Sequence, residues 1–219
     1  MDIKNNLNEI KKTLPEGVTL IAVSKTKPNE AILEAYECGI RDFGENKVQD
    51  LILKYEALPK DIRWHFIGAL QTNKVRKLLG KTFLIQSLDR GSLADEINKI
   101  ASKKNLLVDA LIEVNIGEED NKSGILLKDL EGFIEYLKNL EHINIKGLMA
   151  IIPQGDDAEN KIYFRRMKEV FMELKHKEND RFHMEILSMG MSMDYLSAIE
   201  EGSTMVRVGT GIFGNRNNI

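Results

Sequence analysis

The sequence predicts a single α/β domain, a (β/α)8 TIM-like barrel preceded by an N-terminal helix. Three observations lead to this fold. Short β-branched, apolar runs alternate with helical patterns along the chain, about eight times. These runs are apolar on both faces, as parallel strands covered by helices must be. The length of 219 residues suits one such barrel. An open, doubly wound sheet is the alternative, and eight repeats favour closure.

Each predicted element follows from a local pattern. An amphipathic polar helix over residues 1–13 ends at Pro15-Glu16-Gly17. Pro28 and Gly39 bound the next helix, in the usual order of proline at the start and glycine past the end, and Thr72 is the expected N-cap of another. The strands are expected at 18–23, 40–44, 63–67, 82–86, 106–114, 143–149, 184–187 and 204–208. The helices between them are expected at 28–38, 46–57, 73–79, 93–102, 127–140, 158–175 and 193–200.

Composition narrows the function. The net charge of −3 argues against nucleic-acid or membrane-surface binding, and no apolar run approaches the roughly 18 residues that span a bilayer. The single cysteine, Cys38, suits a reducing compartment. The first residues lack the apolar core of a signal peptide. The four histidines have no metal-ligand spacing, so no metal is expected. These features predict a cytoplasmic protein whose single domain covers residues 1–219.

The chemistry-bearing residues gather where the predicted strands end. In a (β/α)8 barrel the active site lies at the carboxyl ends of the strands. The groups that fall there are Lys25, Gly44-Glu45-Asn46, His65-Phe66-Ile67-Gly68, Glu113-Val114-Asn115, Met149, Ser188-Met189-Gly190-Met191-Ser192 and Arg207-Val208-Gly209-Thr210-Gly211. His65 is more consistent with core packing than with a catalytic role.

The loops after the last two strands indicate a phosphate site. Ser188 and Thr210 supply hydroxyls, and Gly190, Gly209 and Gly211 leave backbone amides open to an anion. The alternative is that these glycines only serve turns. The chain has no G-x-x-x-x-G-K-[ST] motif and no G-x-G-x-x-G after its first strand, which excludes the common nucleotide sites.

Lys25 directly follows the first predicted strand. Its alternative interpretation is a charge that marks where this strand meets water. A lysine facing a phosphate site instead suggests a Schiff base with a phosphorylated aldehyde or ketone. Arg207, two residues before Gly209, is expected to point into the same site.

Six motifs in order make the interpretation specific. The chain resembles the pyridoxal-phosphate homeostasis protein family, the single-domain relatives of the alanine racemase N-terminal barrel, from about residue 18 to Gly214. The motifs are Ala22-Val23-Ser24-Lys25-Thr26-Lys27-Pro28, Phe43-Gly44-Glu45-Asn46, His65-Phe66-Ile67-Gly68-Ala69-Leu70-Gln71-Thr72-Asn73-Lys74, Gly147-Leu148-Met149-Ala150, Ser188-Met189-Gly190-Met191-Ser192 and Arg207-Val208-Gly209-Thr210.

The resemblance implies a cofactor and its contacts. Lys25 would hold pyridoxal 5′-phosphate (PLP) as a Schiff base, and Ser188, Gly209 and Thr210 would hold its phosphate. Arg207 would face the pyridine nitrogen. Asn46 and Met149 would lie around the ring face.

The resemblance also predicts a carrier without significant catalysis. A guanidinium beside the pyridine nitrogen disfavours its protonation, which weakens the ring as an electron sink. Racemases of this fold take a tyrosine base from a second domain, whereas this chain stops at Ile219 and its five tyrosines all fall on predicted helices. We therefore expect a monomer that takes part in vitamin B6 homeostasis, with PLP-dependent apoenzymes as partners. A slow PLP-dependent racemase and an aldolase-like barrel are the alternatives.

Overall fold

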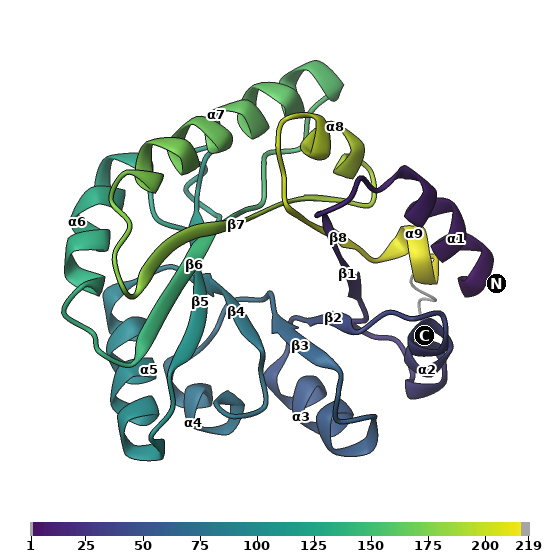
Figure 1. Cartoon of the computed structure of the whole chain (residues 1–219), viewed down its shortest axis with the longest axis horizontal. Coiled ribbons are helices and arrows are strands. Elements are labelled where there is room, and N and C mark those ends of the chain that lie inside the picture. Colours follow the sequence, from purple (N-terminus) through teal and green to yellow (C-terminus); the bar gives the residue numbers. More distant parts are fainter. Residues whose placement is uncertain (1, 216–219) are drawn as a thin grey trace.

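The computed structural model describes residues 2–215, and its eight strands form one closed parallel barrel in the order β1 to β8 (Figure 1). Strand β8 pairs in parallel with β1 and closes the ring. The strands are β1 (Thr19–Val23), β2 (Asp42–Glu45), β3 (Arg63–Phe66), β4 (Leu84–Leu88), β5 (Val108–Val114), β6 (Ile143–Ala150), β7 (Phe182–Met191) and β8 (Met205–Val208). The predicted TIM-like barrel is confirmed.

Helices surround the barrel, and α1 precedes its first strand, as predicted (Figure 1). The helices are α1 (Ile3–Thr13), α2 (Asn29–Glu37), α3 (Val48–Ala57), α4 (Val75–Leu78), α5 (Gly91–Lys104), α6 (Leu127–Leu137), α7 (Asp157–Lys175), α8 (Tyr195–Glu200) and α9 (Thr210–Phe213). Asp2 caps α1, because its Oδ1 accepts a hydrogen bond from the Asn5 amide at 2.8 Å. The α1 helix lies beside α9, and Asn6 Nδ2 donates to the Ile212 carbonyl at 2.9 Å.

The barrel separates two apolar cores. A large cluster fills the space between strands and helices, whereas a small one fills the barrel itself. The buried members of the small cluster are Ile21, Val23, Leu84, Leu111, Met149 and Met205. Alternate strand residues point inward, which explains why the strands are apolar on both faces.

Several boundaries shift by two or three residues, and three elements differ more from the prediction. β7 runs to Met191, so the segment from Ser188 to Met191 belongs to the strand and not to a loop, because parallel pairing with β8 continues to Met191. The helix expected at 73–79 is a 3₁₀ turn (Thr72–Lys74) followed by the short α4, and Thr72 is not its N-cap. The short α9 was not predicted, since Gly209, Thr210 and Gly211 resemble a turn in sequence.

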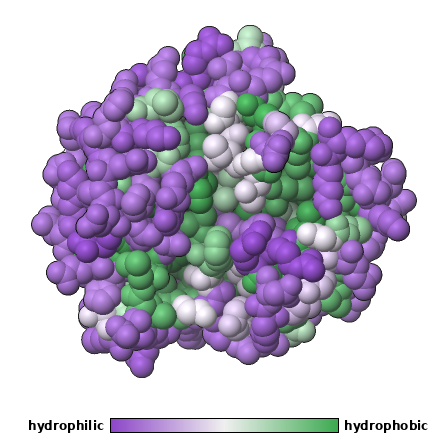
Figure 2. All heavy atoms as spheres, in the orientation of Figure 1, coloured by the Kyte–Doolittle hydropathy of each residue, from purple (hydrophilic) through white to green (hydrophobic). Residues whose placement is uncertain are grey.

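The surface is polar over the helices. Figure 2 shows hydrophilic residues around the rim of one face and hydrophobic residues nearer its centre. Within residues 2–215, none of the helices is both long and apolar enough to cross a bilayer.

Candidate functional site

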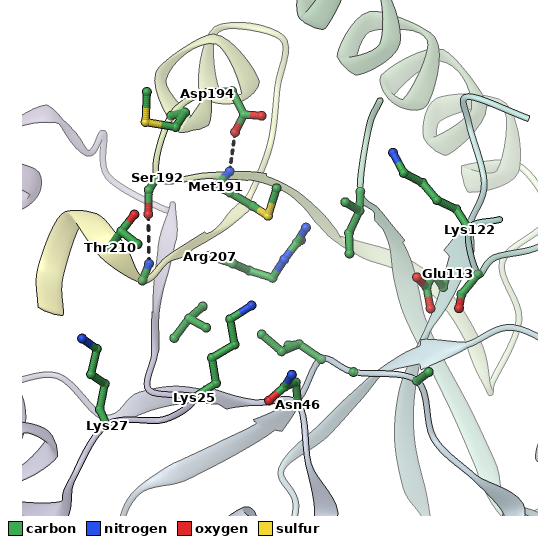
Figure 3. A pocket seen from close by; sticks show the side chains of 18 of the residues that line it. Lys25, Lys27, Asn46, Glu113, Lys122, Met191, Ser192, Asp194, Arg207 and Thr210 are labelled. Carbon is green, nitrogen blue, oxygen red and sulfur yellow. Dashed lines mark hydrogen bonds between the residues drawn. The ribbon is translucent and has the colours of Figure 1, made fainter. Parts of the chain in front are cut away.

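A cavity of about 640 Å³ opens at the carboxyl ends of the strands, and this volume is typical of small-molecule sites. Its walls come from the segments after most of the strands. The residues that argue for a function are Lys25, Lys27, Asn46, Glu113, Lys122, Ser192, Asp194, Arg207, Gly209 and Thr210. In Figure 3, Lys25 and Arg207 extend into the same space, and Glu113 and Lys122 lie on the other side of it.

β1 ends at Val23 and delivers Lys25 to this cavity through a fixed turn. Thr26 adopts a left-handed conformation, with φ of 66°, which turns the chain sharply after the lysine. The Ser24 amide continues the sheet by donating to the Gly44 carbonyl at 3.0 Å. The side chain of Lys25 is half-buried.

A buried ion pair lies directly behind this turn. Lys54 Nζ, from α3, donates to Glu45 Oε1 at 2.6 Å and to the Ser24 carbonyl at 2.9 Å. Ser24 Oγ donates to the same Glu45 oxygen at 2.7 Å. Glu45 is fully buried, and Lys54 is nearly so. These bonds hold the backbone on the amino side of Lys25.

Asn46 follows Glu45 at the cavity, and its backbone packs directly against Gly68. A Cβ at Gly68 would lie 2.3 Å from the Asn46 carbonyl oxygen, closer than any real contact. The two loops therefore pack backbone to backbone. Both residues line the cavity.

The segments after β7 and β8 converge on one hydroxyl. Ser192 Oγ accepts hydrogen bonds from the amides of Gly209 and Gly211, at 3.1 and 3.3 Å, and Figure 3 shows the first of these bonds. Thr210 lies between these two glycines and also lines the cavity. Two amides that share one oxygen acceptor, with hydroxyls beside them, form a favourable environment for the oxygens of a phosphate.

Arg207 is a buried cation with neutral direct partners. Its Nη1 donates to Ser188 Oγ at 2.7 Å, and its Nη2 donates to the Ala150 carbonyl at 2.9 Å. Burial lowers the pKa of Arg207 to about 10, against the attraction of Glu113 and Asp194. Arg207 therefore remains charged at neutral pH, in a wall of the cavity.

Glu113, at the end of β5, is the acidic counterpart in the cavity. Burial and the nearby Asp89 raise the pKa of its carboxyl to about 7, although Arg207 acts in the opposite direction. The group therefore titrates near neutral pH. Sequence alone placed Glu113 at a strand end but could not give its burial.

Two further lysines line the cavity, and both bind backbone carbonyls. Lys27 Nζ donates to the carbonyls of Phe213 and Gly214, at 2.9 and 3.2 Å, and so ties the end of α9 to the loop after β1. Lys122 Nζ donates to the Ile152 carbonyl at 3.2 Å and pairs with Glu119. The cavity thus carries more positive than negative side chains.

Five of the seven predicted site residues come together here, namely Lys25, Asn46, Arg207, Gly209 and Thr210. Met149 and Ser188 are fully buried inside the barrel and are not among the lining residues. The Ser188 hydroxyl is engaged with Arg207 and with Gln86, so its expected phosphate contact stays a prediction, whereas Ser192 of the same motif lies in the cavity wall.

The sequence could have indicated Ser192, since the same motif contains both serines. What separates them is β7, which carries Ser188 at a sheet position paired with Met149. Ser192 comes directly after that strand ends.

None of the tyrosines in residues 2–215 lines the cavity. Tyr195 directly follows the cavity-lining Asp194 in the chain, but its hydroxyl lies 3.0 Å from Thr13 Oγ1 on α1. In the same range, no three His, Cys, Asp or Glu side chains gather as metal ligands would. His65 is buried between Asp42 and Gln86, as expected for a core residue.

The fold and site define a class of protein, a barrel of the alanine racemase N-terminal type. The model of the alanine racemase N-terminal domain family matches residues 1–217. The pyridoxal phosphate homeostasis protein of Aquifex aeolicus is 49% identical over 199 residues, which cover 90% of this chain and 86% of that protein. That of Escherichia coli K12 is 37% identical over 230 residues, covering 98% and 97%. This chain therefore belongs to the pyridoxal phosphate homeostasis protein family.

Solved structures of similar proteins have the same fold as this chain. PipY of Synechococcus elongatus PCC7942, solved without PLP, is 38% identical, with a TM-score of 0.91 over 97% of this chain and 100% of that one. The same protein solved with PLP bound gives 0.88. Alanine racemase from Corynebacterium glutamicum, 16% identical with a TM-score of 0.76, shares the fold over 99% of this chain and 62% of its own.

Proposed function

We propose that this protein binds PLP through Lys25 and serves as a carrier in vitamin B6 homeostasis, without significant catalysis. The observation that carries the proposal is one cavity in which an amine, a guanidinium and paired backbone amides meet. The names of the relatives and the PLP-bound structure of PipY support the same ligand.

The residues present fit the chemistry of this cofactor. PLP supplies an aldehyde, which the Lys25 amine can hold as a Schiff base with loss of one water. Ser192 and Thr210 offer hydroxyl donors to a phosphate dianion, and the Gly209 amide, which donates to Ser192 Oγ, lies beside them. Asn46 lies beside Lys25 in the cavity wall. Met149, behind this wall, supports the cavity by packing in the barrel core.

Arg207 gives an electronic reason for weak catalysis. Its guanidinium is charged at neutral pH and has no carboxylate as a direct hydrogen-bond partner among the described residues. Such a cation beside a pyridine nitrogen adds like-charge repulsion to the protonated ring. A ring that stays unprotonated withdraws fewer electrons from a bound amino group.

The cavity also lacks a tyrosine base among residues 2–215. Racemisation needs proton transfer on both faces of the substrate carbon, which calls for two positioned groups. Lys25 can serve as one of them. Glu113, with its pKa raised to about 7, is a candidate for the second group, and we expect at most a slow side reaction.

The test of the carrier function combines binding and transfer. Wild-type protein should bind PLP with the absorbance of a Schiff base near neutral pH, and Lys25→Ala should lose that absorbance. Loaded protein is then mixed with a PLP-dependent apoenzyme and a trap for free PLP. Reconstitution despite the trap supports direct transfer. Alanine racemisation at about 1–10³ s⁻¹, the range of ordinary enzymes, would overturn the non-catalytic role.

The proposal includes a cellular location and an oligomeric state. A carrier of this kind would act in the cytoplasm as a monomer and deliver PLP to apoenzymes there. Sedimentation of the purified protein, with and without PLP, tests the monomer: a stable dimer at micromolar concentration would contradict it.

A further inference from the structure

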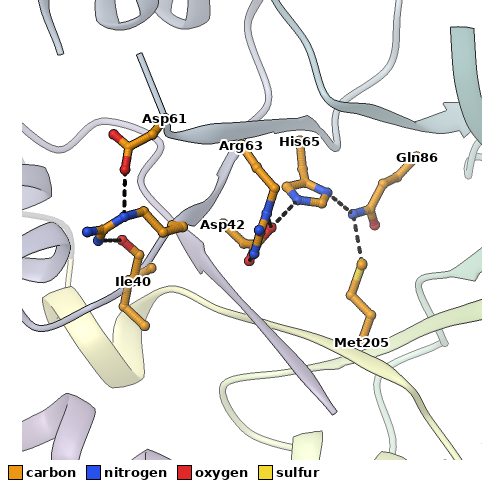
Figure 4. Close-up of polar contacts among 8 residues, drawn as sticks. Ile40, Asp42, Asp61, Arg63, His65, Gln86 and Met205 are labelled. Atoms are coloured by element: carbon orange, nitrogen blue, oxygen red, sulfur yellow. Dashed lines mark hydrogen bonds and ion pairs between the residues drawn. The ribbon is translucent and has the colours of Figure 1, made fainter. Parts of the chain in front are cut away.

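A chain of hydrogen bonds runs through the inside of the barrel and ends at Arg207. Arg207 Nη1 donates to Ser188 Oγ at 2.7 Å, and Ser188 Oγ donates to Gln86 Oε1 at 2.7 Å. Gln86 Nε2 then lies 3.1 Å from His65 Nδ1, and His65 Nε2 lies 2.9 Å from Asp42 Oδ1 (Figure 4). The five residues come from β8, β7, β4, β3 and β2.

Every link of the chain can donate in the same sense. The guanidinium can only donate, and an ionised carboxylate can only accept. Between these ends, the Ser188 hydroxyl and the Gln86 side-chain amide each accept one hydrogen bond and donate the next. Neutral His65 does the same when it carries its proton on Nε2. The two ends thus fix the tautomer of His65, the orientation of the Gln86 amide and the direction of the Ser188 hydroxyl.

The surroundings keep this order in place. His65, Gln86 and Ser188 are completely buried, so water does not compete for their hydrogen bonds. Burial lowers the pKa of His65, and its bond to Asp42 only partly opposes this, so the ring stays neutral. Arg63 anchors the far end, because its Nε donates to Asp42 Oδ1 at 2.7 Å and its Nη2 pairs with Oδ2.

Arg207 needs such support because two carboxylates, those of Glu113 and Asp194, compete for its guanidinium. Glu113 and Asp194 attract its guanidinium, and both line the cavity. A long side chain released from Ser188 would be free to turn toward these carboxylates. The hydrogen bonds to Ser188 and the Ala150 carbonyl hold it instead in the barrel wall.

We propose that Ser188, Gln86 and His65 are positioning residues for Arg207, and that their hydrogen-bonded chain from Asp42 sets the place of the guanidinium at the cofactor cavity. None of the three lines the cavity. Their effect on a ligand must therefore pass through Arg207. The proposal rests on the proposed function only for the identity of the ligand used in the test.

The first measurement needs no ligand. Imidazole ¹⁵N spectra of the unliganded protein report the tautomer of each histidine, and a His65→Gln sample assigns the His65 signals. The chain requires the Nε2–H tautomer at pH 7. An Nδ1–H tautomer or a protonated ring at that pH would overturn the proposal, whether or not the protein binds PLP.

The second measurement compares buried serines on two strands of the barrel, β7 and β4. Ser188→Ala cuts the chain, whereas Ser87→Ala removes an equally buried hydroxyl that has no hydrogen-bond partner among the described residues. We expect Ser188→Ala to weaken PLP binding about tenfold, as loss of a hydrogen bond to a charged group does, and Ser87→Ala to leave it unchanged. Equal affinities of the two variants would contradict the proposal.

A further pair of variants changes His65, which is three hydrogen bonds from Arg207. His65→Gln keeps one acceptor for Gln86 and one donor for Asp42, whereas His65→Leu keeps neither. Affinity for PLP should follow the hydrogen bonds, with His65→Gln close to wild type and His65→Leu weakened, after both are shown to be folded by thermal unfolding. Should His65→Leu not fold, Gln86→Leu takes its place. Wild-type protein that binds no PLP would instead refute the proposed function and leave the tautomer as the test of the chain.

Discussion

Two buried cations flank the cavity, and they are compensated in different ways. Lys54 forms a direct ion pair with Glu45 at 2.6 Å. Among the described residues, Arg207 donates to a hydroxyl and a carbonyl, and the carboxylates of Glu113 and Asp194 act on it through space. Lys54 therefore stabilises the turn before Lys25, whereas the charge of Arg207 remains available to a ligand. Whether a buried charge can act on a ligand therefore depends on its hydrogen-bond and ion-pair partners, and not on the residue type alone.

Removing Lys54 should produce the largest loss of stability. Lys54→Met leaves the Glu45 carboxylate buried without a counter-ion, and one Glu45 oxygen already has no partner within residues 2–215. Breaking a buried pair in this way costs about 3–5 kcal/mol. Chemical denaturation measures the loss, and Lys47→Met, at an exposed residue before the same helix, is the control. Adding Glu45→Gln should recover part of it; an unchanged free energy of unfolding in Lys54→Met would mean that the pair is not structural.

Glu113 tests the charge that faces Arg207. Its pKa rises from 4.5 to about 7 on folding, so the folded protein holds this proton more tightly than the unfolded chain. Stability from this group is complete below pH 4.5 and is lost as the pH rises through 7. The difference corresponds to about 3 kcal/mol.

Glu113→Gln should remove this dependence. Relative to wild type, the variant should gain stability at pH 8 and differ little at pH 4. Denaturation of the unliganded proteins across this range measures the effect. A gain that is the same at both pH values would show that Glu113 ionises normally.

Arg207→Met should separate binding from stability. The substitution removes two hydrogen bonds, which lowers stability. It also removes a buried charge, and the desolvation cost that this charge carried in the folded protein is no longer present, which offsets part of the loss. We expect a smaller loss of stability than for Lys54→Met, of about 1–2 kcal/mol. PLP affinity should fall by about tenfold or more, measured by absorbance titration. A larger loss of PLP affinity in folded Lys54→Met than in folded Arg207→Met would contradict the assignment of Arg207 to the ligand and of Lys54 to stability.

Ser192→Ala should have the smallest effect on folding. The amides of Gly209 and Gly211 lose a shared acceptor, but water can replace it at this partly exposed position. A loss of about 1 kcal/mol in stability is expected. PLP binding should weaken, and inorganic phosphate should compete less well with it. Equal competition by phosphate in both proteins would place the phosphate site elsewhere.

Much of this arrangement could be predicted from the sequence. The alternation of strands and helices predicted the barrel. The position of Lys25, Asn46, Gly209 and Thr210 after strands, and of Arg207 near the end of one, predicted five cavity residues. Ser188 and Met149 could not be separated from the lining by sequence, because the end of β7 and the inward direction of both side chains depend on sheet register. Cross-barrel contacts such as Ser188 with Gln86 join residues 102 positions apart, and no local pattern indicates them.

Lys25 is central to the account, and a direct measurement tests it. Protein loaded with PLP is reduced with borohydride, digested and analysed by mass spectrometry, so that the modified lysine is identified. We predict a phosphopyridoxyl group on Lys25 alone, with none on Lys27, Lys54 or Lys122. A label on one of these other lysines, or the same labelled site in Lys25→Ala, would contradict the assignment of Lys25 as the covalent anchor.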